Sequence, residues 1–519
     1  MENQSAKSMT SSVGKVSSAT ALSRVLGLIR EQVVAYFFGA GLATDSFIAA
    51  FRIPNLLRDL FAEGALSQAF IPVFKDKMVK QGNAEAFRLA NLTISALILI
   101  VGLVIALGII FSPGIVYISA KGFTSNPEKF QLTVSLTRLM FIYLLMVSVS
   151  AVFMGILNSA GRFGVPALSP ALFNVGMILA PVLLYHYFDV PIYTMAIGVI
   201  VGGIGQLVFQ IPSLLKIGFR FKFMINFADE GIRRIGRLIS PMILGLSASR
   251  INILINTLLA SLLIEGALSY LNYAYRLMHF PLGVFAVAVG TVALPKISGE
   301  YAGDRMDALV RTFYDSVGLA MFLVVPSAVY LAGFGEDLVR LIYQRGAFGA
   351  EATINTTHAL FFYSFGLIGF AGVRVAAPVY YAMGDARRPM YYSVFAVVLN
   401  IVLNFAFIPV WGFAGLAAAT SAAGLVNYFL LMFNLKKKIP DLKLVAVIIR
   451  IIIMILAALG SFILIRLIDL SIIIEPVNIF RKIALVGLQV AGMGVIYLAI
   501  CRLLNLSEVN SLLKIFKRK

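Results

Sequence analysis

The sequence predicts an all-α polytopic membrane protein with fourteen transmembrane helices, and three observations lead to this fold class. The chain of 519 residues is 60% hydrophobic, with a mean hydropathy of +0.93, which excludes a soluble globular protein. Its apolar runs, such as 92–111 and 451–465, are uninterrupted, whereas the strands of a membrane barrel alternate apolar and polar residues. Only helices and closed barrels satisfy the backbone in lipid, so these runs are predicted to be helices.

Fourteen segments are long enough to cross a bilayer as tilted helices. They are expected at residues 16–38, 43–73, 87–112, 131–158, 166–188, 191–215, 234–262, 266–295, 308–333, 354–382, 389–408, 412–435, 444–468 and 481–505. Most Lys and Arg outside these spans fall in loops on the side of the N-terminus, and few, such as Lys121 and Lys129, fall in the opposite loops. The positive-inside rule therefore places both termini in the cytoplasm.

The chain also repeats itself at a period of about 220 residues, which predicts two lobes of six helices. An even number of spans gives both lobes the same orientation, so a pseudo-twofold axis along the membrane normal and a central cavity are expected. The ordered matches pair Ser23, Arg24, Gly41, Arg52 and Pro72 with Ser249, Arg250, Gly266, Arg276 and Pro295. The predicted domains are an N-terminal lobe at 1–220, a C-terminal lobe at 221–440, and two extra helices with a basic tail at 441–519.

Composition and motifs argue against several other classes of protein. A single cysteine, Cys501, excludes an intrachain disulfide, and three scattered histidines give no Cys/His metal site. We find no phosphate-binding loop and no nucleophile–base set, so the chain is predicted to be a transporter without a cofactor and not an enzyme. The net charge of +19 follows the topology of the loops, which argues against nucleic acid as a partner. No cleavable signal peptide is evident, because the first apolar segment is long and contains arginines.

Seven arginines in predicted spans have no Asp or Glu three or four residues away to neutralise them: Arg24, Arg30, Arg52, Arg58, Arg250, Arg276 and Arg374. A charge at the bilayer centre costs about 2.5–3.5 kcal/mol, so such residues normally face a water-filled substrate path. Guanidinium groups chelate phosphate oxygens, which predicts an anionic, phosphate-bearing substrate. Apart from Arg250, the arginines expected to bind it are Arg24, Arg30, Arg52, Arg58, Arg276 and Arg374.

Other roles for these charges remain open. The arginines could form purely structural ion pairs, and Arg374 could instead extend to the membrane interface. The residues expected to balance charge or to gate the path are Glu31, Asp45, Asp59, Glu63 and His279, although a lone membrane histidine is commonly a packing residue.

A second polar set could coordinate Na⁺ through amide and hydroxyl oxygens, but without a carboxylate such a site is weak. Hydrogen bonding between helices is the alternative role. The set consists of Asn256, Asn400, Asn404 and Thr420.

The first two spans carry a specific family resemblance. SRVLGLIRE (23–31), FGAGLATDSF (38–47) and PNLLRDLFAEGALSQAFIP (54–72) resemble the signature of the MurJ (MviN) family, the lipid II flippases of bacterial cell-wall synthesis. This family belongs to the multidrug/oligosaccharidyl-lipid/polysaccharide exporter superfamily. GRFGVPALSPALFN (161–174) and YYAMGDARRP (380–389) extend the resemblance along the chain.

The resemblance implies a two-lobed transporter of the bacterial inner membrane that moves lipid II by alternating access. It matches Arg24, Arg30, Arg58 and Arg276 to essential cavity arginines, Arg52 to a basic cavity position and Asp45 to an acidic one. It also implies that residues 444–505 hold the lipid tail, and that partners include membrane lipids and other cell-wall synthesis proteins.

The driving force and the exact substrate depend on departures from the family pattern. Some members bind Na⁺, with acids at the positions of Asn256 and Asn404; both are Asn here, so membrane potential is the expected driver. Two alternatives stay open. The first is a flippase for another polyprenyl-pyrophosphate glycan, such as an O-antigen unit. The second is a cation-coupled drug antiporter, which the arginine surplus opposes.

Overall fold

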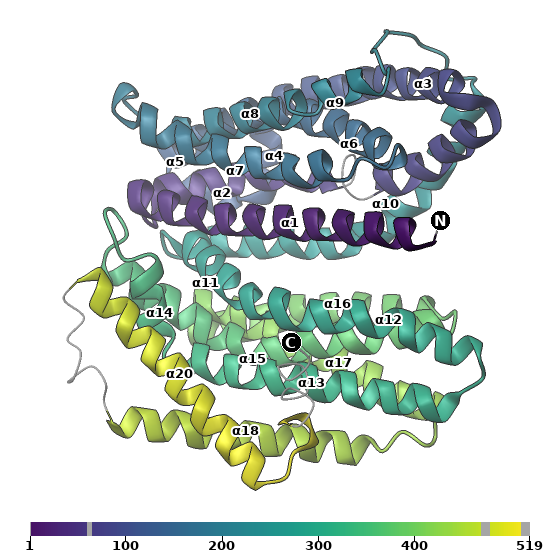
Figure 1. Ribbon diagram of the computed structural model, residues 1–519. Helices are drawn as coiled ribbons and strands as arrows, with labels where there is room; N and C mark the ends of the chain where they lie inside the picture. The colour runs from purple at the N-terminus through teal and green to yellow at the C-terminus, as the bar shows by residue number, and fades with distance from the viewer. Residues whose placement is uncertain (1, 60–64, 469–477, 510–519) are drawn as a thin grey trace. The chain divides into compact units, whose positions relative to one another are not determined.

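The computed structural model describes residues 2–59, 65–468 and 478–509, apart from the side chains of residues 2–17, 65, 240, 241 and 243–249. Throughout these ranges every regular element is a helix. Contacts divide the chain into two compact units (Figure 1). Unit 1 comprises Met1–Ser269 and Arg345–Phe348, and unit 2 comprises Tyr270–Gln344 and Gly349–Lys519.

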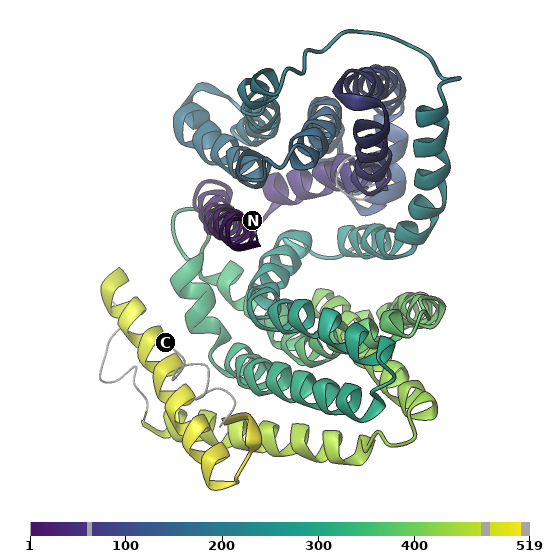
Figure 2. The ribbon, with the colours of Figure 1, turned by 45° about the vertical axis from the view of Figure 1, so that its right-hand side comes forward.

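Unit 1 is a helical bundle in which α7 packs on α1 and α8, and α3 packs on α6 and α10 (Figure 2). Its helices are α1 (Glu2–Phe38), α2 (Leu42–Arg58), α3 (Ala65–Ile110), α4 (Ser112–Ser119), η2 (Lys121–Ser125), α5 (Pro127–Phe141), α6 (Tyr143–Ser159), α7 (Gly164–Leu184), η3 (Tyr185–Tyr187), α8 (Tyr193–Val208), α9 (Ile211–Lys216) and α10 (Glu230–Ser261).

Small residues let α7 and α8 approach closely. A Cβ on Gly202 would lie 2.7 Å from the carbonyl oxygen of Phe173, and one on Gly176 would lie 2.5 Å from the amide nitrogen of Gly202. Membrane helices have little hydrophobic drive to associate, so close backbone packing of this kind supplies much of their attraction.

Unit 2 is a second bundle, in which α15 packs on α13 and α17, and α18 packs on α13 and α20. Its first helix, α11, begins at the end of unit 1, and the π-helix η4 joins α11 to α12. The helices are α11 (Ala267–Pro281), η4 (Leu282–Ala286), α12 (Val287–Ala302), α13 (Met306–Gly333), α14 (Gly335–Ile342), α15 (Ala350–Ala382), α16 (Arg387–Trp411), α17 (Phe413–Lys438), α18 (Leu444–Ile468) and α20 (Ile479–Leu503).

The structure confirms the all-helical membrane fold class, and each predicted span overlaps a helix. Within the described residues, eleven helices are long and apolar enough to cross a membrane. The helices α1, α2 and α10 are not among these eleven. These three carry Arg24, Arg30, Arg52, Arg58 and Arg250.

Two helix boundaries differ from the predicted ones. In the span expected at 43–73, α2, with Pro54 inside it, extends to Arg58 and α3 begins at Ala65, while residues 60–64 lie outside the described residues. The α3 helix then continues to Ile110 through an abrupt bend at Gly82, whose φ is 84° and ψ is 176°. The first helix begins at Glu2 rather than at residue 16, because hydropathy gives no signal for a polar helix.

The two units do not have the same boundaries as the lobes expected from the internal repeat. The α10 helix falls in unit 1, whereas the repeat assigns it to the second lobe. The pseudo-twofold relation between lobes stays a prediction.

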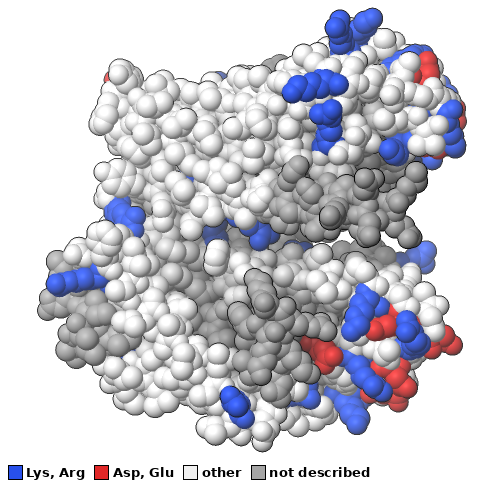
Figure 3. Space-filling model, viewed as in Figure 1, with Lys and Arg blue, Asp and Glu red and all other residues white. Residues whose placement is uncertain are grey.

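Charged side chains are unevenly distributed on each unit. On the face shown in Figure 3, the long sides of both units carry few charges, and most Lys and Arg gather toward one end of each unit. An uncharged belt of this kind suits a hydrocarbon environment, where ionised side chains are costly.

Candidate functional site

The α1 helix places two arginines on unit 1. Arg24 is exposed, and Arg30 is largely buried, with 13% of its side chain accessible. Arg30 donates from Nη2 and Nε to Glu31 Oε1, at 2.6 and 3.2 Å, and from Nη1 to Asn174 Oδ1 on α7 at 2.9 Å. Asn174 in turn donates to the carbonyl oxygen of Ser23 at 3.1 Å. This network fixes the guanidinium of Arg30 between α1 and α7.

A second cluster joins the end of α2 to α10. Asp59 Oδ1 accepts from Arg58 Nη2 at 3.0 Å, and Asp59 Oδ2 lies 2.8 Å from Arg250 Nη1. The three side chains are partly accessible, at 23% for Arg58, 13% for Asp59 and 31% for Arg250. One carboxylate therefore serves two guanidinium groups, and the cluster keeps a positive charge.

Positive charge exceeds negative charge across these helices. Arg52 is half-buried on α2 and adds a fifth arginine, while the carboxylates in the two clusters are those of Glu31 and Asp59. Glu63, which the sequence also suggested as a charge partner, lies outside the described residues. The described part of unit 1 thus has the charge needed to attract an anion.

Asp45 is bound in a buried network of its own. It is 1% exposed in the first turn of α2, and its Oδ2 accepts from Lys129 Nζ of α5 at 2.8 Å. The same carboxylate accepts from the amides of Gly266 and Ser269, at 2.8 and 2.9 Å, and from Ser269 Oγ at 2.6 Å. Asp45 therefore caps the N-terminal turn of α11, where the amides lack helical partners and the helix dipole favours an anion.

The candidate arginines of unit 2 lie on α11 and α15. Arg276 and Arg374 are exposed, and both act electrostatically on His279, which places the three in one neighbourhood. The imidazole of His279 contacts the ring of Tyr275, with centroids 3.9 Å apart, and its Nδ1 lies 3.0 Å from the Tyr275 carbonyl oxygen. Two arginines and a histidine thus form a basic cluster within this unit.

The polar residues suggested as an ion site are divided between the units. Asn400 Nδ2 donates to Thr420 Oγ1 at 3.2 Å, and Asn404 Nδ2 donates to Asn400 Oδ1 at 3.4 Å. Asn256 lies in unit 1, on α10. The Asn400–Thr420 bond joins α16 to α17, which is the alternative role that the sequence allowed, and the Asn404–Asn400 bond lies within α16. Among the residues described, no three His, Cys, Asp or Glu side chains converge to hold a metal ion.

Sequence reasoning missed Lys129, Ser269 and Asn174. Lys129 was counted as a loop residue, but it is 6% exposed and its ammonium lies 4.3 Å from the centre of the Phe123 ring. Its partner Asp45 is 84 residues away, too far for any local pattern to indicate the pair. Asn174 did leave a signal, since it ends the quoted motif at 161–174 as an amide within an apolar span.

This architecture is that of a multi-pass helical membrane protein. A family model described as lipid II flippase MurJ matches residues 34–476. The lipid II flippase MurJ of Burkholderia cenocepacia is 34% identical over 427 residues, covering 82% of this chain and 83% of that protein. A probable lipid II flippase MurJ of Vibrio cholerae is 36% identical over 425 residues, covering 80% and 81%.

Solved structures agree with the sequence relatives. Lipid II flippase MurJ in an inward closed conformation aligns with a TM-score of 0.78 and 26% identity, covering 94% of this chain and 99% of that one. An inward-facing multidrug resistance transporter of the MATE family, in the MOP superfamily, aligns at 0.65 with 14% identity, a likeness of fold alone. The chain belongs to the MurJ family, whose members are transporters and not enzymes.

Proposed function

We propose that this protein is a lipid II flippase, which moves the undecaprenyl-pyrophosphate-linked peptidoglycan precursor from the cytoplasmic to the outer leaflet of the bacterial inner membrane. The observation that carries the proposal is the family match across residues 34–476, together with the arginine-rich helices α1 and α2. A large polar headgroup cannot pass through hydrocarbon unaided, so a wet path is required while the tail remains in lipid.

The pyrophosphate is the group that the arginines recognise in this proposal. Arg30 and Arg58 are each oriented by an adjacent carboxylate, which holds the guanidinium in place before substrate arrives. Arg24 on α1 and Arg52 on α2 add further positive charge, and Arg276 and Arg374 supply charge from unit 2. Guanidinium groups bind phosphate oxygens through paired hydrogen bonds, which favours this chemistry over a simple ammonium site.

In the transport cycle, Asp45 holds the N-terminal turn of α11 in place and does not bind the substrate. Its carboxylate is saturated by Lys129, Gly266 and Ser269, so it has no lone pair directed to a phosphate and would repel one. Opening this network would release the N-terminal turn of α11, the helix that carries Arg276. Alternating access then follows if bound substrate favours one conformation and the intact Asp45 hydrogen-bond network favours the other.

The energy source in this proposal is membrane potential. Asn400, Asn404 and Thr420 are linked by hydrogen bonds and include no carboxylate, which makes a Na⁺ site weak. The potential does work of about 2.3 kcal/mol on each elementary charge that crosses the membrane, per 100 mV.

The proposal also includes the topology, the lipid-tail surface and the partners. Both termini lie in the cytoplasm, and helices α18 and α20 provide the surface for the lipid tail. Other cell-wall synthesis proteins are partners.

A depletion strain tests the proposal. Cells that lose their own flippase should accumulate lipid II on the cytoplasmic leaflet, and this protein should restore its exposure in a leaflet-resolved assay. Arg24→Ala, Arg30→Ala and Arg276→Ala are each expected to abolish rescue while the protein still inserts. Arg340→Ala, at an exposed ion pair on α14, is the matched control and should rescue. Rescue by the triple alanine variant, or exposure of an O-antigen glycolipid instead of lipid II, would contradict the assignment.

A further inference from the structure

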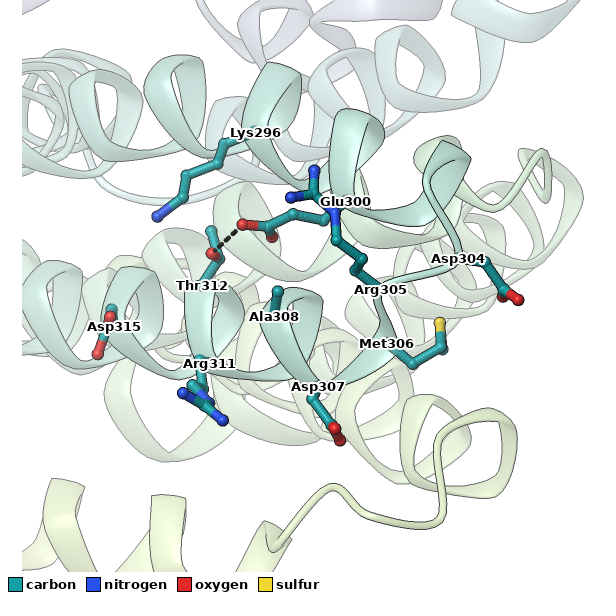
Figure 4. Close-up of a pocket in the computed structure, with 10 residues that line it drawn as sticks. All are labelled: Lys296, Glu300, Asp304, Arg305, Met306, Asp307, Ala308, Arg311, Thr312 and Asp315. Atoms are coloured by element: carbon teal, nitrogen blue, oxygen red, sulfur yellow. Dashed lines mark hydrogen bonds between the residues drawn. The ribbon is translucent and has the colours of Figure 1, made fainter.

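A charged cavity lies where α12 turns into α13, within unit 2. Its volume is about 660 Å³, within the range of about 300–1,000 Å³ typical of small-molecule sites. Figure 4 shows its lining side chains on the two helices and on the turn between them, with Lys296, Glu300 and Thr312 in the space between the helices. The arginine clusters described above use none of these residues.

One buried carboxylate on this cavity lacks a complete set of partners. Glu300 is 7% exposed, and its Oε1 accepts from Thr312 Oγ1 at 2.8 Å, the bond drawn in Figure 4. The second oxygen, Oε2, is buried and makes no hydrogen bond. A buried carboxylate oxygen left in this state costs free energy that a donor from a ligand would recover.

Basic side chains surround this carboxylate without pairing to it. Lys296, Arg305 and Arg311 line the cavity and are exposed, and the described structure records no side-chain hydrogen bond or ion pair for any of the three. Lys296 and Glu300 lie one helical turn apart, a spacing that commonly supports an ion pair, yet their charges remain separate. These cations are therefore available to an anionic group.

The acids at the rim nearly balance the bases. Asp304, Asp307 and Asp315 are exposed, and with Glu300 they give four negative charges against three positive ones. A polyanion or a polycation would meet repulsion from half of the lining. The acids also do not converge into a metal site within the described residues.

We propose that this cavity binds a small zwitterion of the amino-acid type. Its ammonium or guanidinium group donates to Glu300 Oε2, and its carboxylate lies against Lys296 and Arg311. A ligand with both charges matches the nearly balanced lining, and its cation supplies the donor that the buried oxygen lacks. The site is independent of the transport function, since it involves neither the arginine clusters nor Asp45.

Calorimetric titration of the purified full chain in nanodiscs with L-arginine and L-lysine tests the site. Saturable binding of at least one is expected, with agmatine, which lacks the carboxylate, and butyrate, which lacks the cation, at least tenfold weaker. Glu300→Gln should weaken amino-acid binding at least tenfold. Arg311→Gln, a change at an exposed residue, should weaken amino-acid binding but leave the weak agmatine binding unchanged.

The control Glu351→Gln removes one carboxylate at the exposed start of α15 and should bind as the unmodified protein does. Three results would overturn the proposal: no saturable binding of either amino acid, equal binding by Arg311→Gln and the unmodified protein, or agmatine binding as tight as that of L-arginine. The last result would indicate a site for cations alone.

Discussion

Removing Lys129 should destabilise unit 1 strongly, because it leaves the buried Asp45 carboxylate without its cationic partner. The side chains of Lys129 and Asp45 are only 8% and 2% accessible. Breaking a buried ion pair by deleting one partner costs about 3–5 kcal/mol. Two amides and one hydroxyl still donate to Asp45, so Lys129→Met is expected near the lower limit, about 3 kcal/mol. At about 1.4 kcal/mol per factor of ten, the unfolding equilibrium constant rises roughly a hundredfold.

The measurement is reversible unfolding of the purified protein, with Lys121→Met as the control. Lys121 is an exposed lysine near the same end of unit 1, and its loss should change stability by less than about 1 kcal/mol. The double variant Lys129→Met with Asp45→Asn should be more stable than Lys129→Met alone, because no buried charge then lacks a partner. Unchanged stability of Lys129→Met, or strictly additive losses in the double variant, would refute this account of the pair.

Three further outcomes are expected. Gly202→Val should prevent folding, because even a Cβ would lie 2.7 Å from the Phe173 carbonyl oxygen; normal expression and insertion would contradict the close α7–α8 packing. Lys438 hydrogen-bonds Asp385 and lowers the pKa of that carboxyl, so its stabilising effect is present above the usual Asp pKa of about 3.9 and disappears as pH falls below it. Asp385→Asn should therefore flatten the loss of stability between about pH 5 and 3, and an unaltered acid profile would exclude this pair as its source. Gln489→Leu removes the amide that binds a carboxylate on α14 at 2.8 Å, and hydrogen exchange in α20 should rise; unaltered exchange would show that apolar packing alone holds α20.

The sequence predicted most helices because long apolar runs report membrane burial directly. It failed where a helix is polar, as at the start of α1, because a hydropathy window gives no signal there.

The candidate arginines were visible in sequence because an ionised residue in an apolar run is rare. Their partners were less visible. Glu31 and Asp59 adjoin the arginines they bind, at a spacing that helix rules do not associate with pairing, while Arg250 reaches Asp59 from α10. The capping of α11 by Asp45 depends on chain segments more than 200 residues apart, which only the folded structure brings together.

The bend in α3 has a consequence for which substitutions it can accept. No atom lies within 4 Å of where a Cβ on Gly82 would stand, so the position has room for bulk. Its φ of 84° with ψ near 180° is nonetheless reserved for a residue without chirality. Glycine is therefore required at position 82 by the backbone conformation and not by a lack of room for a side chain. A large D-amino acid would fit this conformation, whereas L-alanine, the smallest chiral residue, would strain the bend or straighten it.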